Sequence, residues 1–577
     1  MKYMKLGTKP DTFYTEEAVR SVVSEIPADL IIHVNNTKYQ LHKFPLLLKC
    51  GLLQRLCSDT DGGDEEPVPV ALHDIPGGEE AFELCAKFCY GISISISAAN
   101  LVPAMLAARF LRMTEAVAKG NLVAKLDTFF DSCVLKGWKD SIAALQAAWR
   151  ISGWTDSRIV QPCIDAIVDK ILMPPSKVTW SYTYTRPGYT RRAQQSVPKD
   201  WWTEDVSELD MEVFRSVLAT VRASRLLPPP LIGEALHVYA CKHLADPLHP
   251  AAGAAANGGV HGDDDETQLA RQRRVLESVV TMIPGEPGAV TGRFLLRLLR
   301  VANFVGASPS TRAQLIRQAG AQLEEARPAD LLIPLPSEPR AYDVGATEAV
   351  LEHFLAQFRR PAAPDERHRM GAAMAKVATI FDEYLRTIAL DPDFPVGKFV
   401  ELAESLPDIA RTHHDGLYHA IDAYLREHPE LSKAEKKRLC RLIDCRKLSP
   451  EVRAQAISND RMPLRTIVQL LFVEQERAIT GAGGAGASSH GATVAAPDRS
   501  SVEVVSRLAE RPLDDEPAPS GEHQPQPDAH RPRRDEHTAM ARSLSASGKA
   551  AARKERTPEE RERERERERG SRMRNKQ

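Results

Sequence analysis

The chain has 577 residues, 43% of them hydrophobic, which is enough for two or three domains with cores of ordinary size. Lys and Arg total 76 against 78 Asp and Glu, and the formal charge of -2 excludes a global attraction to nucleic acid or to an anionic membrane. No uncharged apolar run reaches the ~20 residues of a membrane span, and no signal peptide pattern is found. These features predict an intracellular, cytoplasmic protein.

The nine cysteines are an odd number at scattered spacings, which indicates reduced thiols instead of a disulfide framework. Cys85 and Cys89 are four residues apart and share a helix face. No Cys-x-x-Cys pair or nearby histidine cluster completes a tetrahedral metal site. We therefore expect the cysteines to pack in cores, with no metal ion.

Residues 28–135 predict a mixed region of strands and helices. Residues 30–34 are rich in β-branched side chains and end at Asn35 and Asn36, so they predict a hairpin with residues 39–41. Residues 68–72 predict a third strand, after a Gly-rich acidic loop at 59–66. Helices are expected at residues 45–57 and along the apolar stripe of Leu101, Met105, Ala108 and Leu111.

Residues 136–199 predict helix up to about residue 173, with Trp138, Trp149 and Trp154 as large packing residues. Pro174 and Pro175 then begin an irregular stretch. The aromatic and basic residues 180–186 have the composition of a nucleic-acid platform. The stretch is short and carries no RNA-binding signature, which favours a connector between domains. No nucleic-acid partner is expected.

Residues 200–477 predict a domain of short helices, arranged as a bundle or solenoid. Apolar residues recur at spacings of three and four, and residues 251–266 interrupt them with a flexible Ala- and Gly-rich loop. Several end signals are expected: Asp415 as an N-cap, a capping box at Ser432 and Glu435, and proline at the first position after Ser449. Pro463 is expected to open the last helix.

Residues 478–577 are dominated by Gly, Ala, Ser, Pro and charged residues, a composition that predicts disorder. From residue 549 onward there are 12 Lys and Arg against 7 Glu, so weak contact with an anionic plasma membrane is expected. Arg542 lies three residues before Ser545, as basophilic kinases prefer, so Ser543 and Ser545 are candidate phosphorylation sites. A plain solvated tail is the competing interpretation.

Several segments resemble the plant non-phototropic-hypocotyl family, in which a BTB (POZ) domain precedes a helical domain. In the first hundred residues the resemblance lies in 4–13, 42–47 and 82–91, together with Asp29 and His42. In the helical part it lies in 201–205, 414–425 and 462–472, with Trp201, Trp202, Tyr418 and Tyr424 as structural motif residues. Residues 1–27 form the family's N-terminal segment. The subgroup linked with auxin-dependent organ formation is the one most resembled.

The resemblance implies a non-catalytic adaptor of a cullin-3 RING ubiquitin ligase that dimerises through its BTB domain. The helical domain is then expected to recruit target proteins, with kinases or receptors as partners. By analogy, Glu79, Glu80 and Phe82 are candidate cullin contacts. The structural alternative makes the glutamates first-turn acids that complement the helix dipole, with Phe82 in the core. A signalling scaffold for kinases or membrane transport factors, without ubiquitin transfer, is the competing function.

No catalytic motif supports an enzyme. The chain has no phosphate-binding glycine loop, no nucleophile elbow and no His-Glu-x-x-His helix. His413, His414, Asp415 and His419 have residue types that bind metals, but Asp415 is assigned to a helix end. We expect no catalytic residue, no cofactor and no metal.

Overall fold

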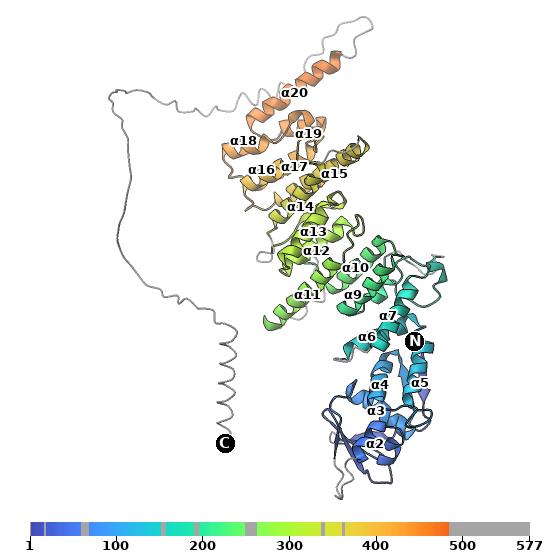
Figure 1. The fold of residues 1–577 in the computed structure, drawn as a ribbon. Helices are drawn as coiled ribbons and strands as arrows, with labels where there is room; N and C mark the ends of the chain where they lie inside the picture. Colours follow the sequence, from blue (N-terminus) through green and yellow to red (C-terminus); the bar gives the residue numbers. More distant parts are fainter. Residues whose placement is uncertain are drawn as a thin grey trace, which may run out of the picture. The chain divides into compact units, whose positions relative to one another are not determined.

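The computed structural model describes residues 2–16, 19–58, 69–151, 157–187, 189, 196–247, 262–335, 341–359 and 364–483. An α/β region at the N-terminus is followed by a mostly helical region (Figure 1), as the sequence predicted at this level. The loop at 59–66, Trp154 and all residues from 484 on, with Ser543 and Ser545, lie outside the described residues. The predicted domain boundaries stay predictions.

The strands of the α/β region form two sheets. One sheet has two antiparallel strands in the order β1-β7, and the other has five strands in the order β2-β3-β5-β4-β6. Two pairs in the larger sheet, β3 with β5 and β4 with β6, are parallel. The strands are β1 (Tyr3–Leu6), β2 (Phe13–Glu16), β3 (Val19–Val22), β4 (Leu30–Val34), β5 (Thr37–Leu41), β6 (Val70–Ala71) and β7 (Ile94–Ser97).

The predicted hairpin is confirmed as β4 and β5. Asn35 has a φ of 50°, a left-handed conformation that asparagine tolerates and that a two-residue hairpin turn requires. Leu30, Ile32 and Val34 alternate inward along β4 and are buried. The inward face of this strand therefore belongs to the core of the region.

The first three strands are not apparent from the sequence pattern. β1 pairs with β7, about 90 residues later in the chain (Tyr3 faces Ser97), so its partner cannot be read locally. At the end of β1, Gly7 has a φ of 81°, and a Cβ there would lie 2.1 Å from the carbonyl oxygen of Ile92. Glycine is required at this position because the backbone between α3 and β7 approaches so closely.

The single helix expected at residues 45–57 is wrong: the segment forms two helices, α1 (Lys43–Leu47) and α2 (Gly51–Ser58). The first amides of α2 do not continue the ladder of α1. Leu52 instead donates its N–H to the carbonyl oxygen of Leu111, at 3.1 Å. A tertiary contact with the C-terminal end of α4 (Ala98–Phe110) thus replaces the hydrogen bonds of a continuous helix.

The remaining helices of the α/β region are α3 (Gly78–Tyr90), α4 (Ala98–Phe110) and α5 (Leu122–Phe129), which continues as a π-helical turn (Phe130–Val134). The helices that follow are α6 (Trp138–Arg150), α7 (Ser157–Ile171), α8 (Thr203–Val206), α9 (Met211–Ser224), α10 (Pro229–His243), α11 (Gly262–Met282), α12 (Gly292–Phe304), α13 (Pro309–Gly320), α14 (Val344–Ala356), α15 (Pro364–Ile388), α16 (Val396–Glu404), α17 (Asp415–Glu427), α18 (Lys433–Cys440), α19 (Pro450–Ile457) and α20 (Leu464–Gly483).

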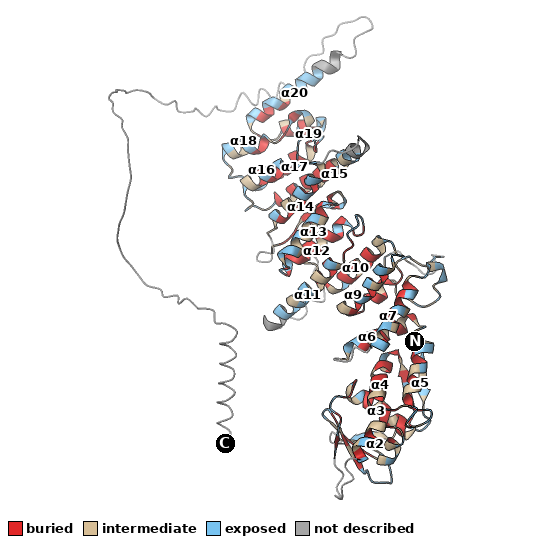
Figure 2. Cartoon of the chain, viewed as in Figure 1, coloured by how far each residue is buried: buried red, intermediate tan, exposed pale blue. Residues whose placement is uncertain are grey.

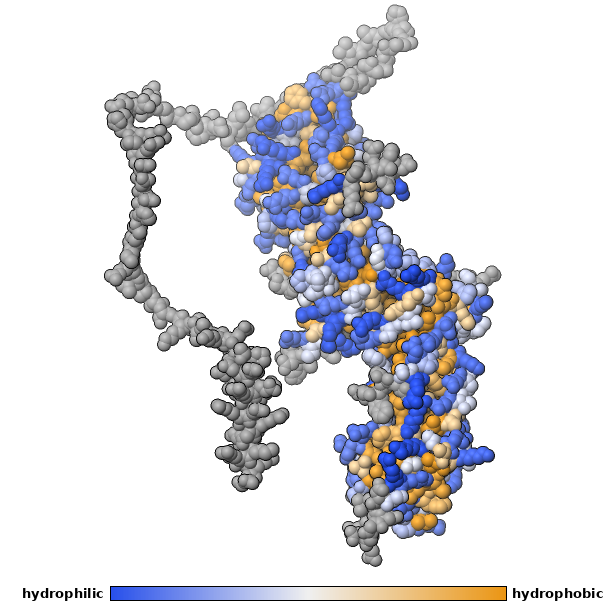
Figure 3. All heavy atoms as spheres, viewed as in Figure 1, coloured by the Kyte–Doolittle hydropathy of each residue, from blue (hydrophilic) through white to orange (hydrophobic). Residues whose placement is uncertain are grey.

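Short 3₁₀ turns join several of these helices, at Pro175–Lys177, Leu323–Glu325, Pro328–Leu331, Gln357–Arg359 and Cys445–Lys447. Neighbours in sequence pack together, for example α12 with α13 and α13 with α14. Buried residues lie on the faces that meet, while exposed ones lie on the outer faces (Figure 2). Hydrophilic side chains dominate the visible face of this helical region (Figure 3).

Helix ends explain where several of these elements begin. The capping box is confirmed: the Ser432 hydroxyl accepts from the Glu435 N–H, and the Glu435 carboxylate accepts from the Ser432 N–H. Pro450 is at the first position of α19, after the N-cap Ser449. The N-cap assignment of Asp415 is wrong, because His414 precedes the helix and the Asp415 carboxylate accepts from the Ser449 N–H at 2.9 Å.

Two further expectations need correction. Trp149 is 39% exposed, so it packs less fully than Trp138, which is 2% exposed. Residues 262–266 of the loop expected at 251–266 belong to α11, which begins at Gly262, and the rest of that range lies outside the described residues. The nine cysteines all lie within the described ranges, and each is a free thiol in the structure.

Candidate functional site

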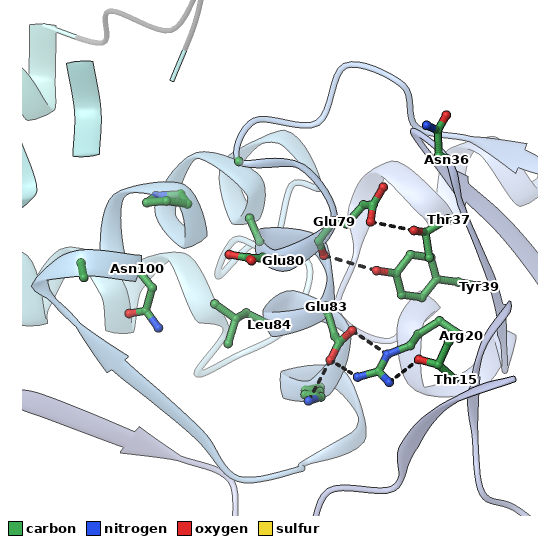
Figure 4. Close-up of a pocket in the computed structure, with 15 residues that line it drawn as sticks. Thr15, Arg20, Asn36, Thr37, Tyr39, Glu79, Glu80, Glu83, Leu84 and Asn100 are labelled. Atoms are coloured by element: carbon green, nitrogen blue, oxygen red, sulfur yellow. Dashed lines mark hydrogen bonds and ion pairs between the residues drawn. The ribbon is translucent and has the colours of Figure 1, made fainter. Parts of the chain in front are cut away.

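A pocket of about 600 Å³ opens beside the first turns of α3, and it is the candidate functional site of the α/β region (Figure 4). We call it the α3 pocket. Helix α3 begins after Gly77, whose φ of 78° turns the chain into the helix. Its lining residues are Thr15, Arg20, Asn36, Thr37, Tyr39, Gly77, Glu79, Glu80, Ala81, Glu83, Leu84, Lys87, Ala99, Asn100 and Pro103.

An ionic network fixes one wall of the α3 pocket. The Arg20 guanidinium donates to both carboxylate oxygens of Glu83, at 2.8 and 2.7 Å, and also to the Thr15 hydroxyl at 2.8 Å. Lys87 binds Glu83 at 2.9 Å and also contacts Asp11. Burial opposes ionisation of Glu83, but the hydrogen bonds from Arg20 and Lys87 lower its pKa. This wall is therefore ionised at neutral pH and ties β2 and β3 to α3.

The two glutamates of the first turn differ in their surroundings. The Glu79 carboxylate accepts from the Thr37 hydroxyl at 2.6 Å, and its carbonyl accepts from the Tyr39 hydroxyl at 3.4 Å. Burial, followed by the charges of Glu83 and Glu79, raises the pKa of Tyr39. Glu80 is exposed on the pocket rim and points away from Thr37. The first turn thus offers an acidic rim to a basic partner segment.

Phe82, the third candidate contact, is fully buried at 0% exposure. Its ring packs on the ring of Tyr39, with centroids 4.8 Å apart. In this conformation the Phe82 side chain cannot touch a partner. It packs in the core, as the structural alternative predicted. Cullin contact by Glu79 and Glu80 stays a prediction.

Asp29 and His42 lie at the corner between β5 and α1. The Asp29 carboxylate accepts from the Lys43 N–H at 2.6 Å. The two ring nitrogens of His42 lie 3.0 Å from the Tyr90 hydroxyl and 2.9 Å from the Ile26 carbonyl oxygen. These contacts support a structural role for both motif residues. Asp29 holds the backbone at Lys43, and His42 contacts the Tyr90 hydroxyl and the backbone at Ile26.

Trp201 and Trp202 lie in the core around α8, at 1% and 0% exposure. The ring of Trp201 meets the rings of Trp138, Trp180 and Tyr182 at centroid distances of 4.7, 5.4 and 5.7 Å. The aromatic residues of the irregular stretch are therefore packing groups in this core. Their rings are not laid out as a stacking platform for bases.

Asp205 in α8 joins three segments at this core. Its carboxylate accepts from the Trp138 indole N–H at 2.7 Å and from the Thr183 backbone N–H at 3.1 Å. Helix α6, which carries Trp138, also packs against α4 of the α/β region. The irregular stretch is thus held against α6 and α8 by a shared core. Its role as a connector between domains stays a prediction.

Tyr418 and Tyr424 occupy the core of α17, at 3% and 1% exposure. The Tyr418 hydroxyl accepts from the Asn459 side chain at 3.2 Å, and the Tyr424 hydroxyl donates to the Phe394 carbonyl. Tyr424 also stacks on His428, with ring centroids 3.8 Å apart. Both tyrosines bury their rings and satisfy their hydroxyls, which supports the structural role expected of motif residues.

The arrangement offers recognition surfaces. Among the described residues, no group of three or more His, Cys, Asp and Glu side chains is placed to hold a metal ion. Within the same ranges, no helix is both long enough and apolar enough to cross a bilayer. The residues that sequence reasoning missed are Arg20, Glu83 and Lys87, and the only local signal is the i,i+4 spacing of the last two.

A family model described as the NPH3 family matches residues 200–452. A BTB/POZ domain-containing protein of Arabidopsis thaliana is 50% identical to the chain, over 89% of this chain and 90% of that protein. The phototropic-responsive NPH3 family protein NPY2 of the same plant is 39% identical, over 84% and 78%. Root phototropism protein 3 of Arabidopsis is 33% identical, over 81% and 76%.

No solved structure matches the chain. The relatives named BTB/POZ proteins and those named NPH3 family proteins both match across most of their length. The subgroup within the family stays a prediction. The extent of these matches, together with an α/β region followed by a helical one, places the chain in the NPH3 family of BTB/POZ domain proteins.

Proposed function

We propose that the chain is a substrate adaptor of a cullin-3 RING ubiquitin ligase. In this proposal the N-terminal α/β region is the BTB domain that binds the cullin, and the helical region recruits the protein to be ubiquitinated. Membership of the NPH3 family supports this class of function. The exposed acidic rim of the α3 pocket is the single structural observation that carries it, because it offers a charged docking edge beside a cavity.

The chain contributes binding and orientation, and the transfer of ubiquitin belongs to the partner enzymes. Glu80 is the residue best suited to contact the cullin, since its side chain is exposed on the rim. Glu79 is held toward Thr37 and orients the rim. Auxin, phototropic or organ-development signalling is the proposed setting.

The test is a Glu80→Lys variant of the full chain, assayed for capture of purified cullin-3. Reversal of an exposed charge costs little stability, so the expected result is at least about tenfold weaker capture with an unchanged fold. Asp131→Lys is the matched control: Asp131 is an exposed acid of the π-helical turn that does not line the α3 pocket.

Equal capture by wild type and by Glu80→Lys contradicts the placement of the contact. Absence of cullin-3 capture by the wild-type chain contradicts the adaptor function itself. That second outcome favours a scaffold that assembles kinases or membrane transport factors without ubiquitin transfer. Substrate lifetime in cells with and without the chain separates the two functions further.

We also propose that the chain forms a homodimer through the α/β region and contacts the plasma membrane weakly through its C-terminal segment. Large apolar side chains near the corner of α1 support the dimer: Ile26 is 69% exposed, Phe44 74% and Leu48 51%. Phe44 and Leu48 are four residues apart, and Ile26 contacts the same corner through its carbonyl bond to His42. The net positive charge after residue 549 supports the membrane contact.

A further inference from the structure

One cysteine differs from the other eight in its surroundings. Seven of the nine cysteines are buried and Cys133 is half-buried, but Cys241 is exposed. It lies in the last turn of α10 and lines a pocket of about 670 Å³. We call this the α10 pocket, and its walls come from α8, α10 and the irregular stretch before α8.

Cationic groups surround the sulfur of Cys241. The guanidinium of Arg297 in α12 donates to Sγ. His237 lies one turn earlier on α10 and lines the same pocket. His237 in turn lies 3.5 Å from the carboxylate of Glu234. Glu234, His237 and Cys241 therefore form a row on one face of α10, in the order acid, base and nucleophile.

Packing holds this row in place. A Cβ on Gly233 would lie 1.8 Å from the Ala289 carbonyl oxygen, so only glycine allows α10 this close to the segment before α12. The His237 ring meets the ring of Phe294 edge-on, with centroids 5.0 Å apart. Arg297 is held by Asp246, with 3.5 Å between Nε and Oδ2. The cations near the thiol are thus fixed by tertiary structure.

The electrostatics favour the thiolate. Partial burial opposes ionisation, but the hydrogen bond and charge of His237, followed by those of Arg297, lower the pKa of Cys241. The hydrogen bonds with Cys241 and Glu234 raise the pKa of His237 to about 9, so the imidazolium persists at neutral pH. The thiolate is the species that attacks disulfides.

The α10 pocket carries both signs of charge close to the sulfur. Lys242 and Arg186 supply cations, while Glu208 and Glu234 supply carboxylates. Arg186 bridges Glu234 and Asp200, each at 2.7 Å, and so fixes one wall. A pocket of this volume holds a ligand of tripeptide size, and mixed charges suit a zwitterion.

We propose that Cys241 is a site of reversible mixed-disulfide formation with a small zwitterionic peptide disulfide, which the α10 pocket binds. The Cys241 thiolate attacks one sulfur of the peptide disulfide, whose S–S bond breaks as the new S–S bond forms. The other half leaves as a thiolate and takes a proton from water. Cys241 is oxidised and the leaving sulfur is reduced, and an added thiol reverses the step.

The experiment incubates the full chain with oxidised glutathione at neutral pH and locates adducts by peptide mass mapping. Cys241 is expected to react at least about threefold faster than Cys133, because the cations beside its sulfur favour the thiolate, and lower nucleophilicity offsets only part of that gain. Cys241→Ser removes the adduct, and Cys133→Ser leaves it unchanged. A reaction no faster at Cys241 than at Cys133 overturns the proposal.

The role of the cations is tested by comparing Cys241 in the folded chain with Cys241 in the unfolded chain. The pH midpoint for alkylation of Cys241 is measured in the folded chain and in concentrated urea, where His237 and Arg297 separate from the sulfur. The midpoint is expected to be lower in the folded chain, and His237→Gln should move it upward. Equal midpoints in both states overturn the proposal without depending on any variant.

Recognition of the peptide is tested separately from thiol reactivity. Lys242→Gln should slow the reaction with oxidised glutathione about threefold, but not the reaction with uncharged hydroxyethyl disulfide. Lys199→Gln is the matched control, since Lys199 is exposed and does not line the pocket. Equal slowing of both reactions by Lys242→Gln contradicts binding of the zwitterion by the pocket. The same holds if Lys242→Gln slows neither reaction.

Discussion

Burial of the His414 imidazole contributes to how the chain responds to acid. The residue is 3% exposed, and its Nδ1 accepts from the Asp444 N–H at 3.1 Å. Burial, followed by the charges of Lys447 and Arg411, lowers its pKa. The neutral ring is therefore the form that fits the folded chain, because a proton on Nδ1 would remove this acceptor.

The sign of the pH effect follows. The unfolded chain binds a proton at His414 below about pH 6.5, where the folded chain does not. The contribution of neutral His414 to the free energy of unfolding is thus complete above about pH 6.5. It is lost as the pH falls from there through the lowered folded-state pKa. We expect His414→Asn, which keeps an acceptor but cannot titrate, to flatten the fall in urea midpoint between about pH 7.5 and about pH 5.5.

The neighbouring His413 supplies the control, since it is exposed. His413→Asn should leave the pH dependence as in the wild-type chain. The same slope in all three proteins would show that His414 titrates alike in the folded and unfolded states. That result contradicts the lowered pKa.

At the scale of single elements, the aromatic core around α8 makes the sharpest prediction. Trp201→Ala removes a ring that is 1% exposed and touches three other aromatic rings. We expect a loss of about 3–5 kcal/mol in the free energy of unfolding, measured by far-UV circular dichroism in urea. Trp149→Ala, at a tryptophan 39% exposed, should cost less than about 1 kcal/mol. Similar losses at both sites would mean that Trp201 does not anchor this core.

The helices and strands also differ in whether they could be predicted from the sequence. The β4–β5 hairpin and the capping box at Ser432 were predictable because their signals lie within a few residues. The strands β1–β3 were not, since β1 finds its partner far along the chain and β3 pairs in parallel with β5. The break between α1 and α2 depends on the Leu52 N–H bond to Leu111, a tertiary contact without a local signature.

The residues of the α3 pocket also differ in whether the sequence reveals them. Glu79 and Glu80 were candidates through the resemblance to other adaptors, and their place in a first helical turn could be read from the sequence because acids favour helix starts. The pairing of Arg20 with Glu83 joins residues 63 positions apart, so only the fold brings them together. Phe82 belongs to the core, although Glu80, two residues earlier, lies exposed on the rim.

For the whole molecule, the first prediction concerns assembly. The full chain is expected to be dimeric by light scattering at micromolar concentration. A charge within an apolar interface is costly, so Phe44→Asp with Leu48→Asp should shift the mass to that of a monomer. Phe472→Asp, at a residue 62% exposed on α20, is the control and should leave a dimer. A monomeric wild-type chain would refute the prediction.

The full chain suits this test better than an isolated fragment of residues 1–135. Helix α4 packs against α6, which such a fragment lacks. Met105 and Leu106 of α4 are each 2% exposed in the complete structure. Removing α6 would uncover apolar surface, and association of that surface could be mistaken for the native dimer.

The second whole-molecule prediction concerns the C-terminal segment. Sedimentation with phosphatidylserine vesicles should detect binding at low salt that weakens at physiological salt. Each phosphate adds about -1.5 to -2 charge, so Ser543→Asp with Ser545→Asp should weaken binding further. A scrambled segment of equal charge is the control for sequence. Binding that is absent at low salt, or equal for the phosphomimetic, rules out an electrostatic switch.

The carboxylate of Asp205 limits how chains of this family can be recombined. It accepts hydrogen bonds from α6 and from the irregular stretch, while α6 also covers α4. A chimera of two relatives joined near residue 135 would inherit α4 from one parent and its covering helix from the other. Joined after residue 206, it would keep Trp138, Thr183 and Asp205 from one parent. A chimera joined after residue 206 should therefore be more stable than one joined near residue 135, because the later junction keeps these hydrogen bonds within one parent.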